Sequence, residues 1–232
     1  MQRLFAIFLL LVLTASPAVA RQLLEYTIRH PVYGEIGTYS NLIEPAANGS
    51  LTVTSRLDVT VKLIGITAHR EHSLRCERWQ DGRLVAFSST TERNGERFEL
   101  RGEARGDSFI IHTPRGVQVG PAHLRPSNPW SVEMLRSGPL LSTRDGALLT
   151  ARVTDGPADT ITRNGRKEQL RRFDIQSDKR DYVWVDAQGV PVAFRTEEHG
   201  DPIDFILTRR IVDSGPQQAS AGPADETAGT VR

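Results

Sequence analysis

Apolar and polar residues alternate along residues 51–63. Leu51, Val53 and Val59 fall on one face of an extended chain, whereas Thr54 and Lys62 fall on the other. A period of two over such a length predicts a half-buried β-strand and not a helix. A strand this long is typical of a strongly curved sheet or of the wall of a barrel.

Turn dipeptides recur at short intervals after this strand, and each separates two segments rich in strand-forming residues. They are Asp81-Gly82, Asn94-Gly95, Asp145-Gly146, Asn164-Gly165 and Gln188-Gly189. Asn-Gly and Asp-Gly favour the hairpin turns whose twist suits antiparallel strands. The pattern therefore predicts an all-β domain of about 10–12 strands, arranged as a large curved antiparallel sheet or as an open or closed β-barrel.

Two local features modify this pattern. Gly34 and Gly37 lie inside an early strand over residues 33–43, where they predict a bulge or a sharp bend. The segment Pro129–Arg136 follows Ser127-Asn128, which supplies a cap residue, carries Trp130 and Met134 four positions apart, and precedes a Gly-Pro pair. We interpret it as one short inserted helix that covers the opening of the sheet.

The two ends of the chain differ from its middle. Arg3, the apolar run Leu4–Leu13 and the small residues at Ala18-Val19-Ala20 are typical of a secretory signal peptide. The apolar run is shorter than the roughly 20 residues that span a bilayer. We therefore expect a signal peptide over residues 1–20, one β domain over residues 21–212 and a disordered tail over residues 213–232, which is poor in large apolar side chains. The mature protein would be periplasmic or extracellular, without a transmembrane span.

Charge and cysteine content exclude several classes of function. The formal net charge is only +1, which leaves no basic field for binding nucleic acid. Cys76 is the one cysteine, so no intramolecular disulfide forms. It shares a strand face with Leu74, which predicts a thiol buried in the core.

No motif for catalysis, metal binding or cofactor binding is recognisable. His69 and His72 would face opposite sides of a strand, so they form no metal pair. The sequence contains no G-x-S-x-G elbow, no Walker loop and no G-x-G-x-x-G motif. A protein without enzymatic activity, metal or cofactor is therefore favoured, although dispersed residues could still converge in an enzyme of unknown class.

Four large side chains are the candidates for lining a ligand cavity: Trp79, Trp130, Met134 and Trp184. Aromatic residues on a sheet usually fill the core, and they line a cavity where a large barrel leaves one. Both interpretations remain open for all four.

Several segments resemble a family of exported proteobacterial domains of unknown function. They are Tyr33–Gly37, Glu77–Leu84, Pro126–Trp130 and Tyr182–Gly189, and the resemblance covers about residues 25–211. That family is similar in turn to the open β-barrels of periplasmic lipoprotein carriers, in which a curved sheet holds a lipid group on its concave face and short helices plug the opening. The resemblance carries over no catalytic residue. It implies a non-catalytic periplasmic binding protein for an apolar or lipid-like ligand; a structural or interaction protein of the cell envelope, acting through a sheet edge or the tail, is the alternative.

Overall fold

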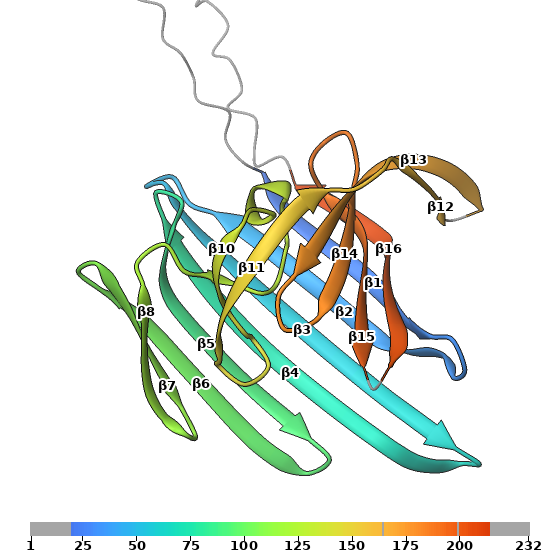
Figure 1. Cartoon of the computed structure of the whole chain (residues 1–232). Helices are drawn as coiled ribbons and strands as arrows, with labels where there is room; N and C mark the ends of the chain where they lie inside the picture. The colour runs from blue at the N-terminus through green and yellow to red at the C-terminus, as the bar shows by residue number, and fades with distance from the viewer. Residues whose placement is uncertain (1–19, 164, 199, 214–232) are drawn as a thin grey trace, which may run out of the picture.

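The computed structural model describes residues 20–163, 165–198 and 200–213 of the chain. These residues form one strongly curved sheet, and strand β11 crosses in front of the long strands β3 and β4 in the view of Figure 1. The strands are β1 (Arg21–His30), β2 (Gly34–Pro45), β3 (Ser50–Leu63), β4 (Ile66–Gln80), β5 (Arg83–Arg93), β6 (Glu96–Arg105), β7 (Ser108–Thr113), β8 (Gly116–Pro121), β9 (Arg125–Pro126), β10 (Gly138–Leu141), β11 (Leu148–Asp155), β12 (Asp159–Arg163), β13 (Arg166–Gln176), β14 (Arg180–Val185), β15 (Pro191–Glu198) and β16 (Asp201–Asp213).

The strand order explains how the sheet curls without closing. Strands β1 to β8 follow one another as an antiparallel meander, and β16 pairs with the free side of β1. The order then continues through β15, β14, β13, β11 and β10 to β9, with β12 attached to β13. The path ends at β8 on one side and β9 on the other, so the sheet is an open barrel.

The predicted all-β class and the curved antiparallel sheet are confirmed, and so are the hairpin turns at Asp81-Gly82 and Asn94-Gly95, where both residues of each pair have positive φ. The sheet has 16 strands, more than the predicted number. Several of the additional strands are short, such as β9 with two residues and β10 with four. Strands of that length are too brief to show alternation in the sequence.

The bend predicted at the early glycines is also confirmed. The pairing of β1 with β2 shifts register after Ile28, which lies opposite Gly37. A Cβ atom on Gly37 would lie only 2.0 Å from the backbone oxygen of Asp58 on β3. Glycine is therefore required at position 37, because the backbone of β3 leaves no room for a side chain.

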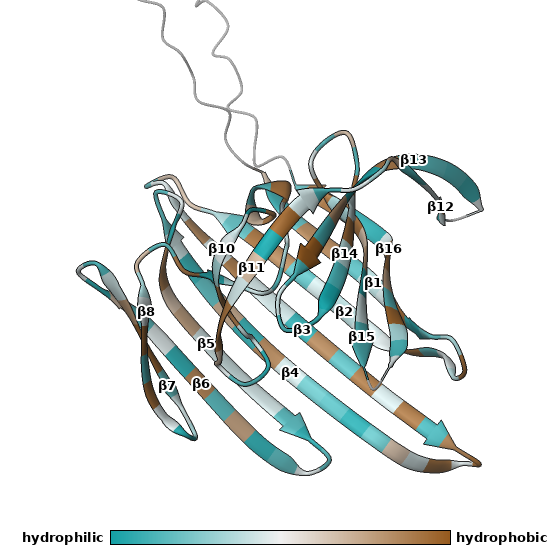
Figure 2. Ribbon diagram, in the orientation of Figure 1, coloured by the Kyte–Doolittle hydropathy of each residue, from teal (hydrophilic) through white to brown (hydrophobic). Residues whose placement is uncertain are grey.

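The inner, concave face of the sheet carries the core. Tyr26, Tyr39 and Phe194 form a ring cluster there, with centroids 5.1–5.7 Å apart, and Phe205 stacks on Phe194 at 4.5 Å. Val53 is fully buried next to this cluster, so the strand predicted from the alternating pattern faces the core as expected. Figure 2 shows the corresponding alternation of hydrophobic and hydrophilic residues along β3 and β4.

The predicted helix over Pro129–Arg136 is wrong. Only Val132–Met134 forms a single 3-10 turn, capped by Ser131. The backbone groups of the segment bond to other parts of the fold: Val132 N–H donates to the Gly189 oxygen, and the Arg125 side chain donates to carbonyl oxygens of the segment. A helix of eight residues is marginal by itself, and these tertiary hydrogen bonds replace its internal ones.

The prediction of a buried Cys76 is also wrong in its choice of face. Cys76 does share a face with Leu74, but that face is the outer one, where Leu74 is 39% exposed and Cys76 is partly exposed. The inner face of β4 carries Arg75, Glu77 and Trp79 instead. The alternation along β4 was predicted correctly, but the face that carries Leu74 and Cys76 was assigned to the core and lies on the outside.

Candidate functional site

Residues 126–136, here called the plug, run from the last residue of β9 towards β10 and lie across the concave face. Two of its side chains, Asn128 and Trp130, reach polar groups on the sheet. The polar groups and the plug residues that contact them form the Glu77 cluster, which consists of Tyr39, Asn41, Ser55, Glu77, Trp79, Asn128 and Trp130.

Glu77 is the centre of this cluster. Its side chain is fully buried on the inner face of β4. The indole N–H groups of Trp79 and Trp130 both donate to Glu77 Oε2, each at 3.0 Å. The two indole rings pack edge to face, with centroids 5.8 Å apart. One carboxylate oxygen thus connects a residue of the sheet to a residue of the plug.

Asn128 makes the second connection between the plug and the sheet. Its side-chain amide donates to Ser55 Oγ at 2.9 Å and to Asn41 Oδ1 at 3.3 Å. The same Asn41 oxygen accepts hydrogen bonds from the Tyr39 hydroxyl at 2.8 Å and from Ser55 Oγ at 2.7 Å. These groups sit opposite one another on neighbouring strands, since Asn41 of β2 pairs with Ser55 of β3.

The Glu77 cluster and the neighbouring Arg75 have more hydrogen-bonding capacity than they use. Asn41 Nδ2, Arg75 Nε and Glu77 Oε1 are buried without a partner among the described residues. They belong to adjacent positions, because Asn41 pairs with Ser55 and Ser55 pairs with Arg75. Most buried polar atoms in proteins are satisfied, so three such atoms in one place mark a polar site and not an ordinary stretch of core.

Burial also changes the acid–base chemistry of the cluster. Loss of solvation raises the pKa of Glu77 to about 7, against the lowering effect of the two indole donors, Asn128 and Arg75. Burial likewise raises the pKa of Tyr39 to about 12. Glu77 is therefore a carboxyl group that titrates near neutral pH, although its 0% exposure keeps it out of reach of any external reactant in this conformation.

The structure separates the four cavity candidates of the sequence. Trp79 and Trp130 meet on Glu77, and Met134 is buried in the same core. Trp184 lies on the opposite face of its strand from Val183, and its indole N–H donates to Asp159 Oδ2 at 3.1 Å. Three of the four thus come from the plug or from the strand beneath it, whereas Trp184 of β14 is buried in the same core but bonds to Asp159 and not to Glu77.

Sequence reasoning missed Glu77 and its polar partners. The sequence did contain a signal for Glu77. Glu77 and Trp79 are two positions apart and therefore share one face of the strand, whereas Leu74 and Arg78 lie on the other face. Asn128 was interpreted as a helix cap, and its side chain instead bonds across to β2 and β3.

Neither metal-ligand clusters nor membrane-spanning helices occur among the described residues. His69 and His72 lie on opposite faces of β4, where His69 contacts Glu71 and His72 contacts Asp58. In this part of the chain no group of three or more His, Cys, Asp and Glu side chains could hold a metal ion. Nor does it contain a helix that is both long and apolar enough to cross a membrane.

The chain was compared with known families, proteins and structures. The model of the "Domain of unknown function (DUF6134)" matches residues 34–208. No curated protein matches the chain. A crystal structure of a beta-barrel-like protein of the domain of unknown function DUF1849 from Brucella abortus is similar with a TM-score of 0.64 at 9% identity, over 84% of this chain and 98% of that one. The likeness establishes a common β-barrel-like fold.

Proposed function

We propose, from the premise that the chain belongs to the DUF6134 family of domains of unknown function, that it is an exported, non-catalytic binding protein for an apolar or lipid-like ligand. The ligand would occupy the concave face after the plug has moved aside. The observation that carries this proposal is the way in which the plug is held: its Asn128 and Trp130 side chains bond to the Glu77 cluster on the concave face.

The surface around these contacts suits an apolar ligand. Leu57, Val59 and Val61 continue along β3 past the Glu77 cluster and are only partly buried. Phe194 and Phe205 border the same core from β15 and β16. Small-molecule sites are usually mostly apolar and contain a few convergent polar groups, which is the composition of this face once the plug has moved aside.

A non-catalytic role fits the burial of Glu77, the carboxyl group whose pKa lies at about 7. As long as Trp79 and Trp130 cover it, the Glu77 carboxyl group has no contact with a substrate. A general acid or base must come within hydrogen-bond reach of its substrate. Here the carboxyl group holds the plug instead.

Export is proposed from the N-terminal sequence alone, because residues 1–19 lie outside the described part of the chain. The supporting observation is that strand β1 begins at Arg21, directly after the expected cleavage site at Ala20. Cleavage there would leave the whole sheet intact. The similarity to periplasmic lipoprotein carriers, proposed from sequence motifs, points to the same compartment. The proposed C-terminal tail lies outside the described residues from residue 214 onwards.

Loosening the plug should increase binding of an apolar probe. We expect Asn128→Ala to raise the affinity for the neutral dye N-phenyl-1-naphthylamine several-fold, because it removes the hydrogen bonds to Ser55 and Asn41. Fluorescence titration measures this. Glu133→Ala, in the same segment but exposed, is the matched control and should bind as the wild type does. Equal probe binding by all three proteins would contradict the proposal.

A second candidate function, an interaction protein at the membrane surface, rests on the β3–β4 hairpin. The last pair of β2 with β3 is Gly37–Val59 and the last pair of β4 with β5 is Glu71–Arg93. Residues 60–70, here called the arm, project past both neighbours, as Figure 1 shows at the end of β3. At its tip Leu63 is 45%, Ile64 103% and Ile66 73% exposed.

The turn of the arm differs from two other hairpin turns in the residue that occupies its first positive-φ position. Ile64 has φ of 51°, a conformation that suits Asn, Asp or Gly and strains a β-branched residue. The equivalent positions of two other turns are Asp81 and Asn94. The arm also carries Lys62 and Arg70 and no carboxylate. An apolar tip between two cations matches an anionic lipid surface.

Ile64→Asn is expected to leave the fold intact and to weaken attachment to vesicles. Asparagine tolerates the positive φ, so thermal stability should not fall. Co-sedimentation with vesicles of phosphatidylglycerol and phosphatidylcholine should drop several-fold relative to wild type. Leu74→Ser, which removes an exposed apolar side chain elsewhere on β4, should sediment as the wild type does. If wild type and Ile64→Asn sediment equally, the arm is not a membrane contact.

A further inference from the structure

A hollow of about 220 Å³ lies beside the plug, where the β4–β5 turn meets the segment that enters β9. Its lining includes Trp79 and Leu84 from the sheet, and it continues over Arg83, His123, Arg125 and Arg136. Three guanidinium groups and one imidazole thus border one small depression. Asp81 is the one carboxylate among the residues that line it.

Arg125 is the buried member of this group, with an exposed fraction of only 2%. Its Nη1 donates to the Met134 carbonyl oxygen and its Nη2 to that of Arg136. These are neutral acceptors, and among the described residues no carboxylate forms an ion pair with it. Burial and the nearby Arg136 lower the pKa of Arg125 to about 10. A buried charge without a counter-charge is costly, so an anion beside it would be favourable.

The neighbouring arginines are similarly uncompensated. Within the described part of the chain neither Arg83 nor Arg136 takes part in an ion pair. Arg83 donates through Nη2 to the Gly106 carbonyl, and its Nε is buried without a partner. Elsewhere on the sheet arginines are commonly paired, as in Arg93 with Glu71 at 2.7 Å and Arg195 with Asp204 at 2.6 Å.

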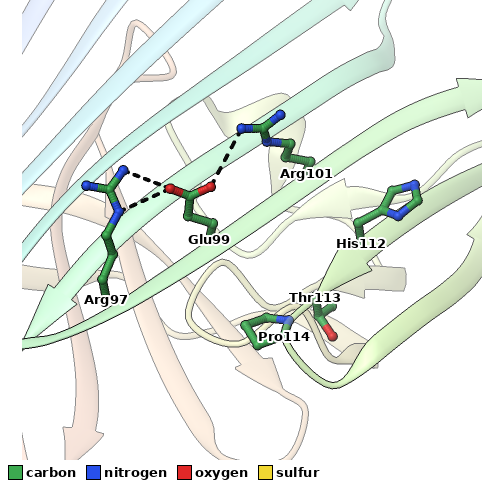
Figure 3. Close-up of a pocket in the computed structure, with 6 residues that line it drawn as sticks. All are labelled: Arg97, Glu99, Arg101, His112, Thr113 and Pro114. Carbon is green, nitrogen blue, oxygen red and sulfur yellow. Dashed lines mark hydrogen bonds and ion pairs between the residues drawn. The ribbon is translucent and has the colours of Figure 1, made fainter.

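A larger hollow on the outer face makes the contrast clear. It has a volume of about 420 Å³ and is lined by Arg97, Glu99, Arg101 and His112, among others (Figure 3). There Glu99 lies between the two arginines, 2.7 Å from Arg97 and 3.6 Å from Arg101. The arginines of the larger hollow are thus already paired with a carboxylate and exposed to solvent. A larger volume alone therefore does not make a hollow an anion site.

We propose that the hollow beside the plug binds an oxyanion, a phosphate or carboxylate group, between Arg83, Arg125 and Arg136. Guanidinium groups recognise such oxygens through charged and often bidentate hydrogen bonds. The Trp79 ring and Leu84 at the same hollow provide an apolar wall for a carbon skeleton attached to the anion. The site is open in the present conformation, so it does not depend on movement of the plug or on the function proposed above.

Two titrations separate the sources of such an anion. Isothermal titration of the full mature chain with inorganic phosphate tests a free anion, and titration with monomeric dihexanoyl phosphatidic acid tests a headgroup that carries apolar chains. We expect wild type to bind at least one of them. Binding of both at equal strength assigns the site to the anion alone, whereas stronger binding of the lipid assigns a role to the apolar wall.

Variants of the two less buried arginines connect this binding to the hollow. Arg83→Gln and Arg136→Gln should each weaken binding by at least about tenfold, because each removes a charged hydrogen bond to the ligand. Arg101→Gln, at the larger hollow, is the matched control and should leave binding unchanged. Circular dichroism confirms that each variant is folded. The proposal is overturned if neither ligand binds to wild type, or if both hollow variants bind as tightly as the control.

Discussion

Replacing Glu77 by glutamine is expected to abolish a pH dependence of stability of about 3 kcal/mol. The pKa of Glu77 is about 7 in the folded protein, against 4.5 for an ordinary glutamate. Between these two values the folded state holds a proton that the unfolded state has released. The free energy of unfolding therefore falls by about 1.4 kcal/mol for each pH unit as the pH rises from about 4.5 to about 7. Above about pH 7 this contribution no longer changes.

Urea unfolding of wild type and Glu77→Gln at several pH values between 4.5 and 8 measures this effect. The difference between the two proteins isolates Glu77 from other groups, such as Asp181, whose pKa is also raised by burial, and Glu71, whose pKa is lowered by Arg93. Glu99→Gln, an exposed substitution on β6, should keep the wild-type profile. Parallel profiles for wild type and Glu77→Gln would show that Glu77 is not buried in the manner described.

Trp130→Ala is the second substitution with a large expected effect, a loss of about 3 kcal/mol in the free energy of unfolding. Truncation of a buried tryptophan costs about 3–5 kcal/mol, and Trp130 is only partly buried, so the lower end applies. The loss combines the packing on Trp79 with the hydrogen bond to Glu77. Thermal and urea unfolding measure it.

Trp130→Phe distinguishes the hydrogen bond from the packing. It keeps an aromatic ring against Trp79 and removes the indole donor, so it should cost about 1–2 kcal/mol. Because a donor to the carboxylate is lost, the pKa of Glu77 should rise further, and the fall in stability should extend to higher pH. Trp184→Phe removes an indole donor to Asp159 instead and is the control, with no change in this profile. If Trp130→Ala changes neither unfolding nor probe binding, the plug is not anchored at this residue.

The sequence predicted the fold better than the site. Alternation over residues 51–63 and the Asn-Gly and Asp-Gly turns report directly on backbone geometry, and the structure has strand β3 and hairpin turns at those places. The helix over Pro129–Arg136 was mispredicted because capping residues and spacing are local signals. The hydrogen bonds that determine its actual conformation come from Arg125 and Gly189. Both residues lie outside the segment, so a helix pattern within it gives no information about them.

The candidate site was only partly accessible from the sequence for a similar reason. Trp79 and Trp130 were singled out as large aromatic residues, and they do meet. Their meeting point, Glu77, depends on which face of β4 turns inward. The strand has apolar residues on both faces, since Leu74 is exposed and Trp79 is buried. Only the pairing of β4 with β3 and β5 resolves that choice.

Hydrogen–deuterium exchange of residues 126–136 tests the central claim most directly, namely that this segment is a displaceable plug on the concave face. In the free protein the amide of Val132 should exchange slowly, because it donates to the Gly189 oxygen at 2.9 Å. Saturation with N-phenyl-1-naphthylamine should speed exchange across the plug several-fold and leave β3 and β4 unchanged. Exchange in the plug that stays the same or slows when the probe is bound would contradict the account.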